Sequence, residues 1–178
     1  MKTLHRKDIS RATGFTLIEV LVAIMLFSFV IAIAMGIFFN ALRGQRSALA
    51  LMAANDNAES ALEQMAREMR TGNSFVLTLP AADGTSIDFI NARGVPVTYR
   101  FNPGANPGAG TIERQETGNA LAITGSNVLV KRLVFIINEG TPSAPSLTRV
   151  TIALEVAPAQ KNIQSISTNI QMTVSPRF

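Results

Sequence analysis

Residues 14–39 read GFTLIEVLVAIMLFSFVIAIAMGIFF, and this stretch decides the fold. From Val20 to Phe39 only Ser28 and Gly36 interrupt a run of apolar side chains. A transmembrane helix needs roughly 20 such residues. The sequence therefore predicts a membrane-inserted helix. Glu19, at the start of the run, is a carboxylate that membrane insertion alone does not require.

The charges on the two sides of the apolar run differ. Four cations and one acid precede it, and the first charge after Phe39 is Arg43. The positive-inside tendency places the N-terminus in the cytoplasm and exports the chain beyond Asn40. The first fourteen residues carry +3 of the formal net charge of +4, so the high pI does not indicate a nucleic-acid partner. The other basic residues are dispersed with few aromatics between them, which also argues against nucleic acid.

Three interpretations of the N-terminus compete. An ordinary secretory signal peptide fits the small-residue site Ala32-Ile33-Ala34, but the apolar stretch runs past that site and contains Glu19. A signal anchor that is never cut is the second interpretation. The third is processing on the cytoplasmic side, before the apolar run begins.

Residues 14–23, GFTLIEVLVA, resemble the cleavage and methylation signal of bacterial type IV prepilins and of the pseudopilins of type II secretion. The resemblance implies that a prepilin peptidase cuts after Gly14 and methylates the new amino group of Phe15. It places the family's assembly glutamate on Glu19. It also implies that the partners are other pilin or pseudopilin subunits, an inner-membrane assembly platform and the membrane itself.

A physical argument for Glu19 stands beside the resemblance. A charged group at the centre of a membrane helix costs about 3 kcal/mol, so such groups usually have a partner. A cut after Gly14 would create a positively charged α-amino group on Phe15, four positions from Glu19. A partner, in the same chain or in a neighbouring subunit, would therefore exist only after processing. The alternative is that Glu19 extends to the cytoplasmic interface and pairs with nothing.

The helix is predicted to continue beyond the membrane, over residues 15–71. No proline occurs before Pro80, and apolar residues recur after Asn40 at steps of three and four. This predicts one buried stripe: Leu42, Leu49, Met52, Ala53, Leu62, Met65, Ala66 and Met69. Glu63 and Arg67 are spaced for an ion pair, and Gly72 is a stop signal.

Gly36 and Gly44 are predicted weak points of this helix. Each lowers helix propensity by about 1 kcal/mol relative to alanine. Gly36 resembles the position at which pilin helices loosen in assembled filaments. The alternative is that Gly36 allows another helix to pack closely.

Beyond Gly72 apolar residues recur at every second position, with polar residues between them. This alternation predicts β-strands, separated by turns rich in Gly, Pro, Asn and Asp. The candidate strands are residues 86–90, 97–101, 111–115, 120–124, 128–137, 150–156 and 166–174. The candidate turns are Asp83-Gly84, Arg93-Gly94, residues 102–110, Thr117-Gly118-Asn119 and residues 139–142. Apolar residues on both faces of 128–137 predict a central strand. We expect an α+β, pilin-like fold, in which the amphipathic half of the helix covers one antiparallel sheet of about five to seven strands.

No catalytic, cofactor or metal constellation is evident. The chain has no cysteine, and its one histidine, His5, precedes the predicted cut. The carboxylates beyond Gly72 show no metal-loop spacing, and residues 104–110 lack the lysine of a phosphate loop. The sequence therefore predicts a structural protein without a cofactor rather than an enzyme.

Four segments follow from these observations: a cleaved leader (1–14), a transmembrane and filament-core half-helix (15–39), an amphipathic half-helix that packs on the sheet (40–71) and a β domain (72–178). We expect a subunit of a type IV pilus or a related filament, first anchored in the inner membrane. The plain C-terminus, without the disulfide loop of many major pilins, favours a minor pilin or a pseudopilin, with major and competence pilins left open. The retained Glu19 argues against the minor subunits that replace this residue and cap filament tips. The alternative is a monomeric, membrane-anchored binding domain.

Overall fold

The computed structural model describes residues 14–78, 85–104, 110–139 and 148–177. In these parts one helix, α1 (Leu17–Arg70), precedes all the strands, which confirms the α+β arrangement. The strands are β1 (Asn73–Leu77), β2 (Ser86–Ile90), β3 (Pro96–Asn102), β4 (Thr111–Glu116), β5 (Asn119–Ala122), β6 (Val128–Asn138), β7 (Arg149–Pro158) and β8 (Thr168–Val174). The chain divides into two compact units, Met1–Gln45 and Arg46–Phe178.

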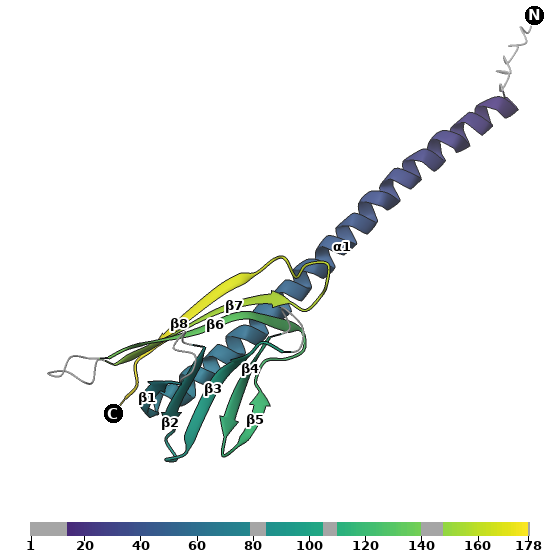
Figure 1. Cartoon of the computed structure of the whole chain (residues 1–178). Helices are drawn as coiled ribbons and strands as arrows, with labels where there is room; N and C mark the ends of the chain where they lie inside the picture. The colour runs from purple at the N-terminus through teal and green to yellow at the C-terminus, as the bar shows by residue number, and fades with distance from the viewer. Residues whose placement is uncertain (1–13, 79–84, 105–109, 140–147, 178) are drawn as a thin grey trace, which may run out of the picture. The chain divides into compact units, whose positions relative to one another are not determined.

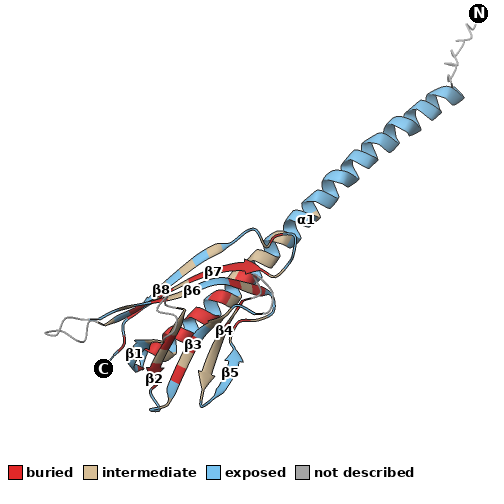
Figure 2. Ribbon diagram, viewed as in Figure 1, coloured by how far each residue is buried: buried red, intermediate tan, exposed pale blue. Residues whose placement is uncertain are grey.

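Helix α1 has 54 residues, close to the predicted range. Its buried stripe lies within the second unit, where one face of the helix enters the core (Figure 2). That stripe consists of Ala54, Ala58, Ala61, Leu62, Met65, Ala66 and Met69. The prediction was wrong for Leu49, Met52 and Ala53, which are exposed. Alanines at positions 54, 58 and 61 form the contact face instead, because small side chains let the helix approach the sheets.

A five-stranded antiparallel sheet has the order β1-β2-β3-β4-β5. Thr117 and Gly118 both have positive φ, 49° and 90°, as a two-residue β4–β5 hairpin turn requires. Strand β1 was not predicted from the sequence. Its pairing with β2 is irregular between Asn73 and Val76, and Ser74 has a φ of 58°, so no clean alternation marks it.

The remaining strands form a second antiparallel sheet with the order β6-β7-β8. The prediction of a single sheet was therefore wrong, as was the prediction that 128–137 is a central strand, because β7 lies in the middle. The pairing of β6 with β7 is irregular between Val130 and Arg132. The inward face changes there from Val128 and Val130 to Leu133 and Phe135, with Lys131 exposed. This change of phase explains why the segment is apolar at both odd and even positions.

Both sheets and the second half of α1 share one hydrophobic core (Figure 1). Strand β6 joins the sheets, because it contacts β1, β2, β3 and β4 in turn. An isolated bridge pairs Gly110 with Val130, and the Val130 amide donates to the Gly110 carbonyl at 2.9 Å. Of the predicted turns, residues 83–84, 105–109 and 140–142 lie outside the described residues.

Candidate functional site

The first turn of α1 is closed by Thr16. The Thr16 Oγ1 atom accepts a hydrogen bond from the Glu19 amide at 3.3 Å. The Thr16 carbonyl accepts from the amides of Glu19 and Val20, at 3.1 and 3.2 Å. A threonine followed three residues later by glutamate is the spacing of a capping box. Thr16 was missed as a site residue, although this spacing is visible in the sequence.

Glu19 therefore lies in the first helical turn, where the helix dipole favours a negative charge. It lines an open groove of about 500 Å³ together with Phe15, Val20, Ala23, Ile24 and Phe27. Phe15 itself is 83% exposed. The structure thus brings Phe15 and Glu19 to one side of the helix start. Within the described residues no salt bridge involves Glu19.

No other part of the chain that the structure describes covers the apolar half of α1. Every residue from Gly14 to Ala41 is exposed, and an 18-residue window of α1 with a mean hydropathy of 2.9 is 0% buried. By length and composition α1 is the one helix of the described residues that can span a membrane. The Ser28 hydroxyl is satisfied internally, since it donates to the Ile24 carbonyl at 2.8 Å. Such a surface needs lipid or other apolar helices around it.

Gly36 and Gly44 both lie in this exposed region. A Cβ atom added at either glycine would meet no other atom within 4 Å. Neither glycine is therefore required by packing against the residues that the structure describes. Helix weakening and close approach of a second helix remain the two explanations.

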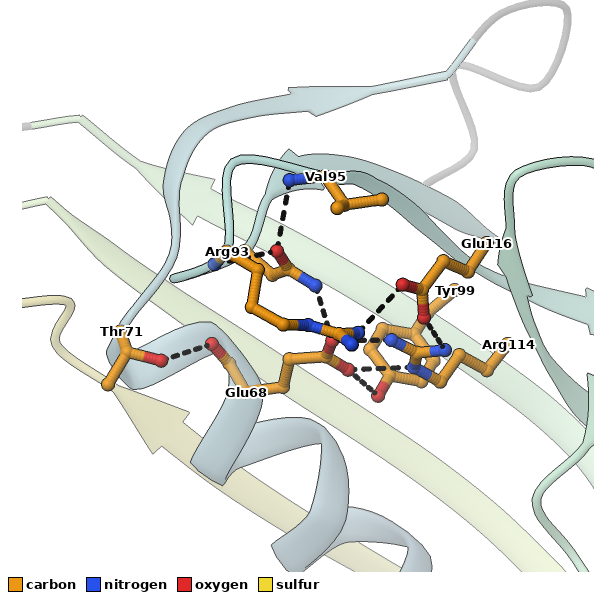
Figure 3. A network of polar contacts seen from close by, with 8 residues as sticks. Glu68, Thr71, Arg93, Val95, Tyr99, Arg114 and Glu116 are labelled. Atoms are coloured by element: carbon orange, nitrogen blue, oxygen red, sulfur yellow. Dashed lines mark hydrogen bonds and ion pairs between the residues drawn. The ribbon is translucent and has the colours of Figure 1, made fainter.

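A second polar cluster centres on Glu68, in the last turns of α1 (Figure 3). Arg114 of β4 donates to both carboxylate oxygens, at 2.9 and 2.6 Å. The Tyr99 hydroxyl donates to Glu68 at 2.6 Å, and the Asn91 amide nitrogen donates at 3.3 Å. Because the hydrogen bonds from Arg114 favour the ionised form, the pKa of Glu68 falls to about 2 although burial opposes this.

The cluster extends along the sheet through further ion pairs. Arg114 also pairs with Glu116 at 2.6 Å, and Glu116 pairs with Arg93 at 2.7 Å. Burial, with the hydrogen bond to Glu68 second, raises the pKa of Tyr99, which stays a neutral donor. The basic residues that look dispersed in the sequence are thus partly gathered by the fold. Arg114 joins α1 to the five-stranded sheet through Glu68, and Arg93 pairs with Glu116 of β4.

No group of three or more His, Cys, Asp or Glu residues that could hold a metal occurs in the described parts of the chain.

The comparison with known families bears on the N-terminus. Residues 9–35 match the family model of the prokaryotic N-terminal methylation motif, so the chain carries the type IV prepilin signal. The match covers Gly14, Phe15, Thr16 and Glu19 and extends into the exposed half of α1. No curated protein and no solved structure matches the chain.

Proposed function

We propose that this protein is a structural subunit of a type IV pilus or pilus-like filament, made as a precursor and cut after Gly14 by a prepilin peptidase. The observation that carries this proposal is the methylation motif at residues 9–35 continuing into a helix that is exposed and apolar over more than twenty residues. Assembly into a filament accounts for both features, the leader that is removed and the exposed apolar helix. The role is structural rather than enzymatic.

The precursor is anchored in the inner membrane through residues 15–39, with the leader (1–14) in the cytoplasm and residues 72–178 exported. Residues 40–71 carry the helix onto the β domain. After the cut, the apolar half-helix leaves lipid and packs among the same segments of other subunits. The half-helices of those subunits are as apolar as lipid. The apolar side chains therefore stay out of water after the transfer.

Glu19 gains its counter-ion during this processing. Before the cut, residue 15 has an amide nitrogen that carries no charge. After the cut, the methylated amine of Phe15 is a cation on the same side of the helix start as Glu19. Pairing between the amine of one subunit and Glu19 of another would fix the axial position of the two helices, because an unpaired charge in apolar surroundings is costly.

Among filament proteins, we place this chain with the minor pilins or the pseudopilins. The absence of cysteine excludes the C-terminal disulfide loop that many major pilins carry. The expected partners are the prepilin peptidase, other pilin or pseudopilin subunits and the inner-membrane assembly platform. The filament lies in the periplasm or on the cell surface.

Mass spectrometry of the protein purified from its native cells tests the proposal. We expect a mature chain that begins at Phe15 and carries one N-methyl group. Its presence in sheared fibres at trace levels would support the minor class, and a dominant band would indicate a major pilin. A chain that retains Met1 would contradict the proposal and favour the monomeric, membrane-anchored binding domain.

A further inference from the structure

The exposed face of α1 in the second unit is divided into bands. Asp56, Glu59 and Glu63 form an acidic band, and all three are exposed. Their spacings of three and four place them on one side of the helix. Arg67 and Arg70, also exposed, continue the same side as a basic band. The centres of the two bands are about nine residues apart along the helix, or about 14 Å at 1.5 Å per residue.

The charges of the two bands take part in no salt bridge among the residues that the structure describes. In the described parts of the chain, the four salt bridges involve Arg93, Arg100, Arg114 and their acidic partners Glu68, Glu113 and Glu116. None involves the acidic or the basic band. Even Glu63 and Arg67, which are spaced for a pair, form no salt bridge there. Both bands are therefore available to another molecule.

The C-terminal segment adds to the basic band. The Arg177 amide donates to the Arg70 carbonyl at 2.9 Å, which brings a third cation to this end of the helix. Two open grooves flank the boundary between the bands. One of about 510 Å³ is lined by Ser60, Glu63, Gln64, Arg67, Glu68 and Thr71, and one of about 350 Å³ is lined by Glu63, Ala66, Arg67, Arg70 and Met172. Side chains of a partner can enter these grooves.

We propose that a second copy of this chain docks here, with the acidic band of one copy against the basic band of the next. This inference rests on the proposed function, because copies anchored in one membrane run parallel. Parallel copies at the same height would place acid beside acid. A displacement of about 14 Å along α1 places acid beside base instead.

Such a contact is heterologous, because the acidic band of one copy meets the basic band of the other. The remaining band of each copy has no partner within this pair. The contact thus sets the axial step between the two copies. Glu19 acts at the other end of the helix, in the apolar segment.

Disulfide cross-linking tests the predicted register, and the cysteine-free chain makes it unambiguous. Cells would produce two variants together, Glu59→Cys and Arg67→Cys. Each chain then has a single cysteine, so every disulfide cross-link joins two chains. We expect dimers from the mixture, few from either variant alone, and few from the matched control mixture of Glu59→Cys with Lys131→Cys.

Charge reversal tests the energetic role. We expect Glu59→Arg/Glu63→Arg and Arg67→Glu/Arg70→Glu each to lower the amount of sheared filament by roughly tenfold, since several like charges then meet. All four changes in one chain should restore filaments, which a folding defect would not allow. Lys131→Glu/Lys161→Glu, which changes the net charge of other exposed residues by the same amount as Arg67→Glu/Arg70→Glu, should have little effect.

The outcomes separate the two proposals. If the wild-type chain is cut after Gly14 and forms filaments, but dimers form equally in the control mixture or the reversals leave filament yield unchanged, the docking inference is wrong and the proposed function stands. If the wild-type chain is never cut and never enters filaments, the proposed function is wrong and the docking inference falls with it.

Discussion

Glu19 and Thr16 together define the start of α1. The threonine hydroxyl satisfies the Glu19 amide, and the carboxylate lies in the positive field of the helix N-terminus. These contacts hold the backbone of residue 19 in place within the precursor. The carboxylate itself remains available for the amine that the proposed cut after Gly14 would create.

Replacing Glu19 separates processing from assembly. We expect Glu19→Ala to be cut after Gly14 at the wild-type rate, because the cut lies before the helix, and to be reduced at least tenfold in filaments, because the new amine then has no partner. Mass spectrometry and sheared-filament yield measure the two effects. Glu19→Asp is the matched control and should retain part of the assembly. Normal entry of Glu19→Ala into filaments would contradict this role.

Gly72 is required by packing rather than by its backbone angle. A Cβ atom on Gly72 would lie 2.6 Å from Phe89 Cδ2 and 3.0 Å from the Ile90 carbonyl oxygen, both in β2. We expect Gly72→Ala to lower the free energy of unfolding by about 1–3 kcal/mol. Thermal unfolding of the purified chain in detergent measures this. Gly44→Ala, where the added methyl group meets nothing, should not destabilise the chain.

At the scale of elements, Glu68 joins the end of α1 to the five-stranded sheet. It accepts hydrogen bonds from β3 and β4 and from Asn91 next to β2. Asn91 also accepts from the amides of Arg93 and Val95, at 3.0 and 3.1 Å, and so orders the β2–β3 turn. One carboxylate thus organises three neighbouring parts of the fold.

The lowered pKa of Glu68 makes this contribution depend on pH. The native state favours the ionised form, so the stabilisation is complete above the unfolded-state pKa and is lost as pH falls from about 5 toward 2. We expect Glu68→Gln to lower the free energy of unfolding by about 2 kcal/mol at pH 7. The difference from wild type should shrink toward pH 2, as denaturant unfolding at several pH values would show.

The control for Glu68 is Glu155→Gln, on the solvent side of β7. Within the described residues Glu155 forms no salt bridge, so its replacement should change stability little at any pH. A constant difference between wild type and Glu68→Gln from pH 7 to pH 2 would contradict the role given to Glu68.

Gly36 offers a test of how the exposed half of α1 behaves in a filament. We expect Gly36→Ala to reduce filament yield, because it raises helix propensity by about 1 kcal/mol at this position. The double variant Gly36→Ala/Asn40→Gly returns a weak point one turn away and should recover the yield. If the double variant stays defective, the loss of close packing at Gly36 is the cause instead.

At the scale of the whole molecule, the two units differ in what surrounds them. The second unit contains the complete hydrophobic core of the described residues, and the first contributes no buried residue to it. We expect a fragment of residues 46–178 to be soluble without detergent and to unfold cooperatively. Size-exclusion chromatography and a thermal melt measure this.

Two comparisons complete this test. The full chain should require detergent to stay in solution. Adding a reducing agent should not change the melting temperature of the fragment, because the chain has no cysteine. An aggregated fragment, or one without a cooperative transition, would show that the first unit is needed for folding.

Local patterns in the sequence were enough to predict the N-terminal signal, the extent of α1 and seven of the strands. The motif at residues 14–23, the helical period of three and four and the alternation of strands all depend on residues close together in the chain. Their physical causes, helix geometry and strand pleating, act over the same short distances. Gly14, Phe15 and Glu19 can therefore be named as candidate site residues from the sequence alone.

Long-range pairing decided the rest. The division into two sheets, the edge position of β6, the exposure of Leu49 and Met52 and the Glu68 cluster all depend on which strand lies beside which. Glu68 and Arg114 are 46 residues apart, and no local pattern brings them together. Strand order is set by the combined burial of all the elements. Only the folded chain therefore shows that Glu68 is paired, while the acidic and basic bands of α1 form no salt bridge within the described residues.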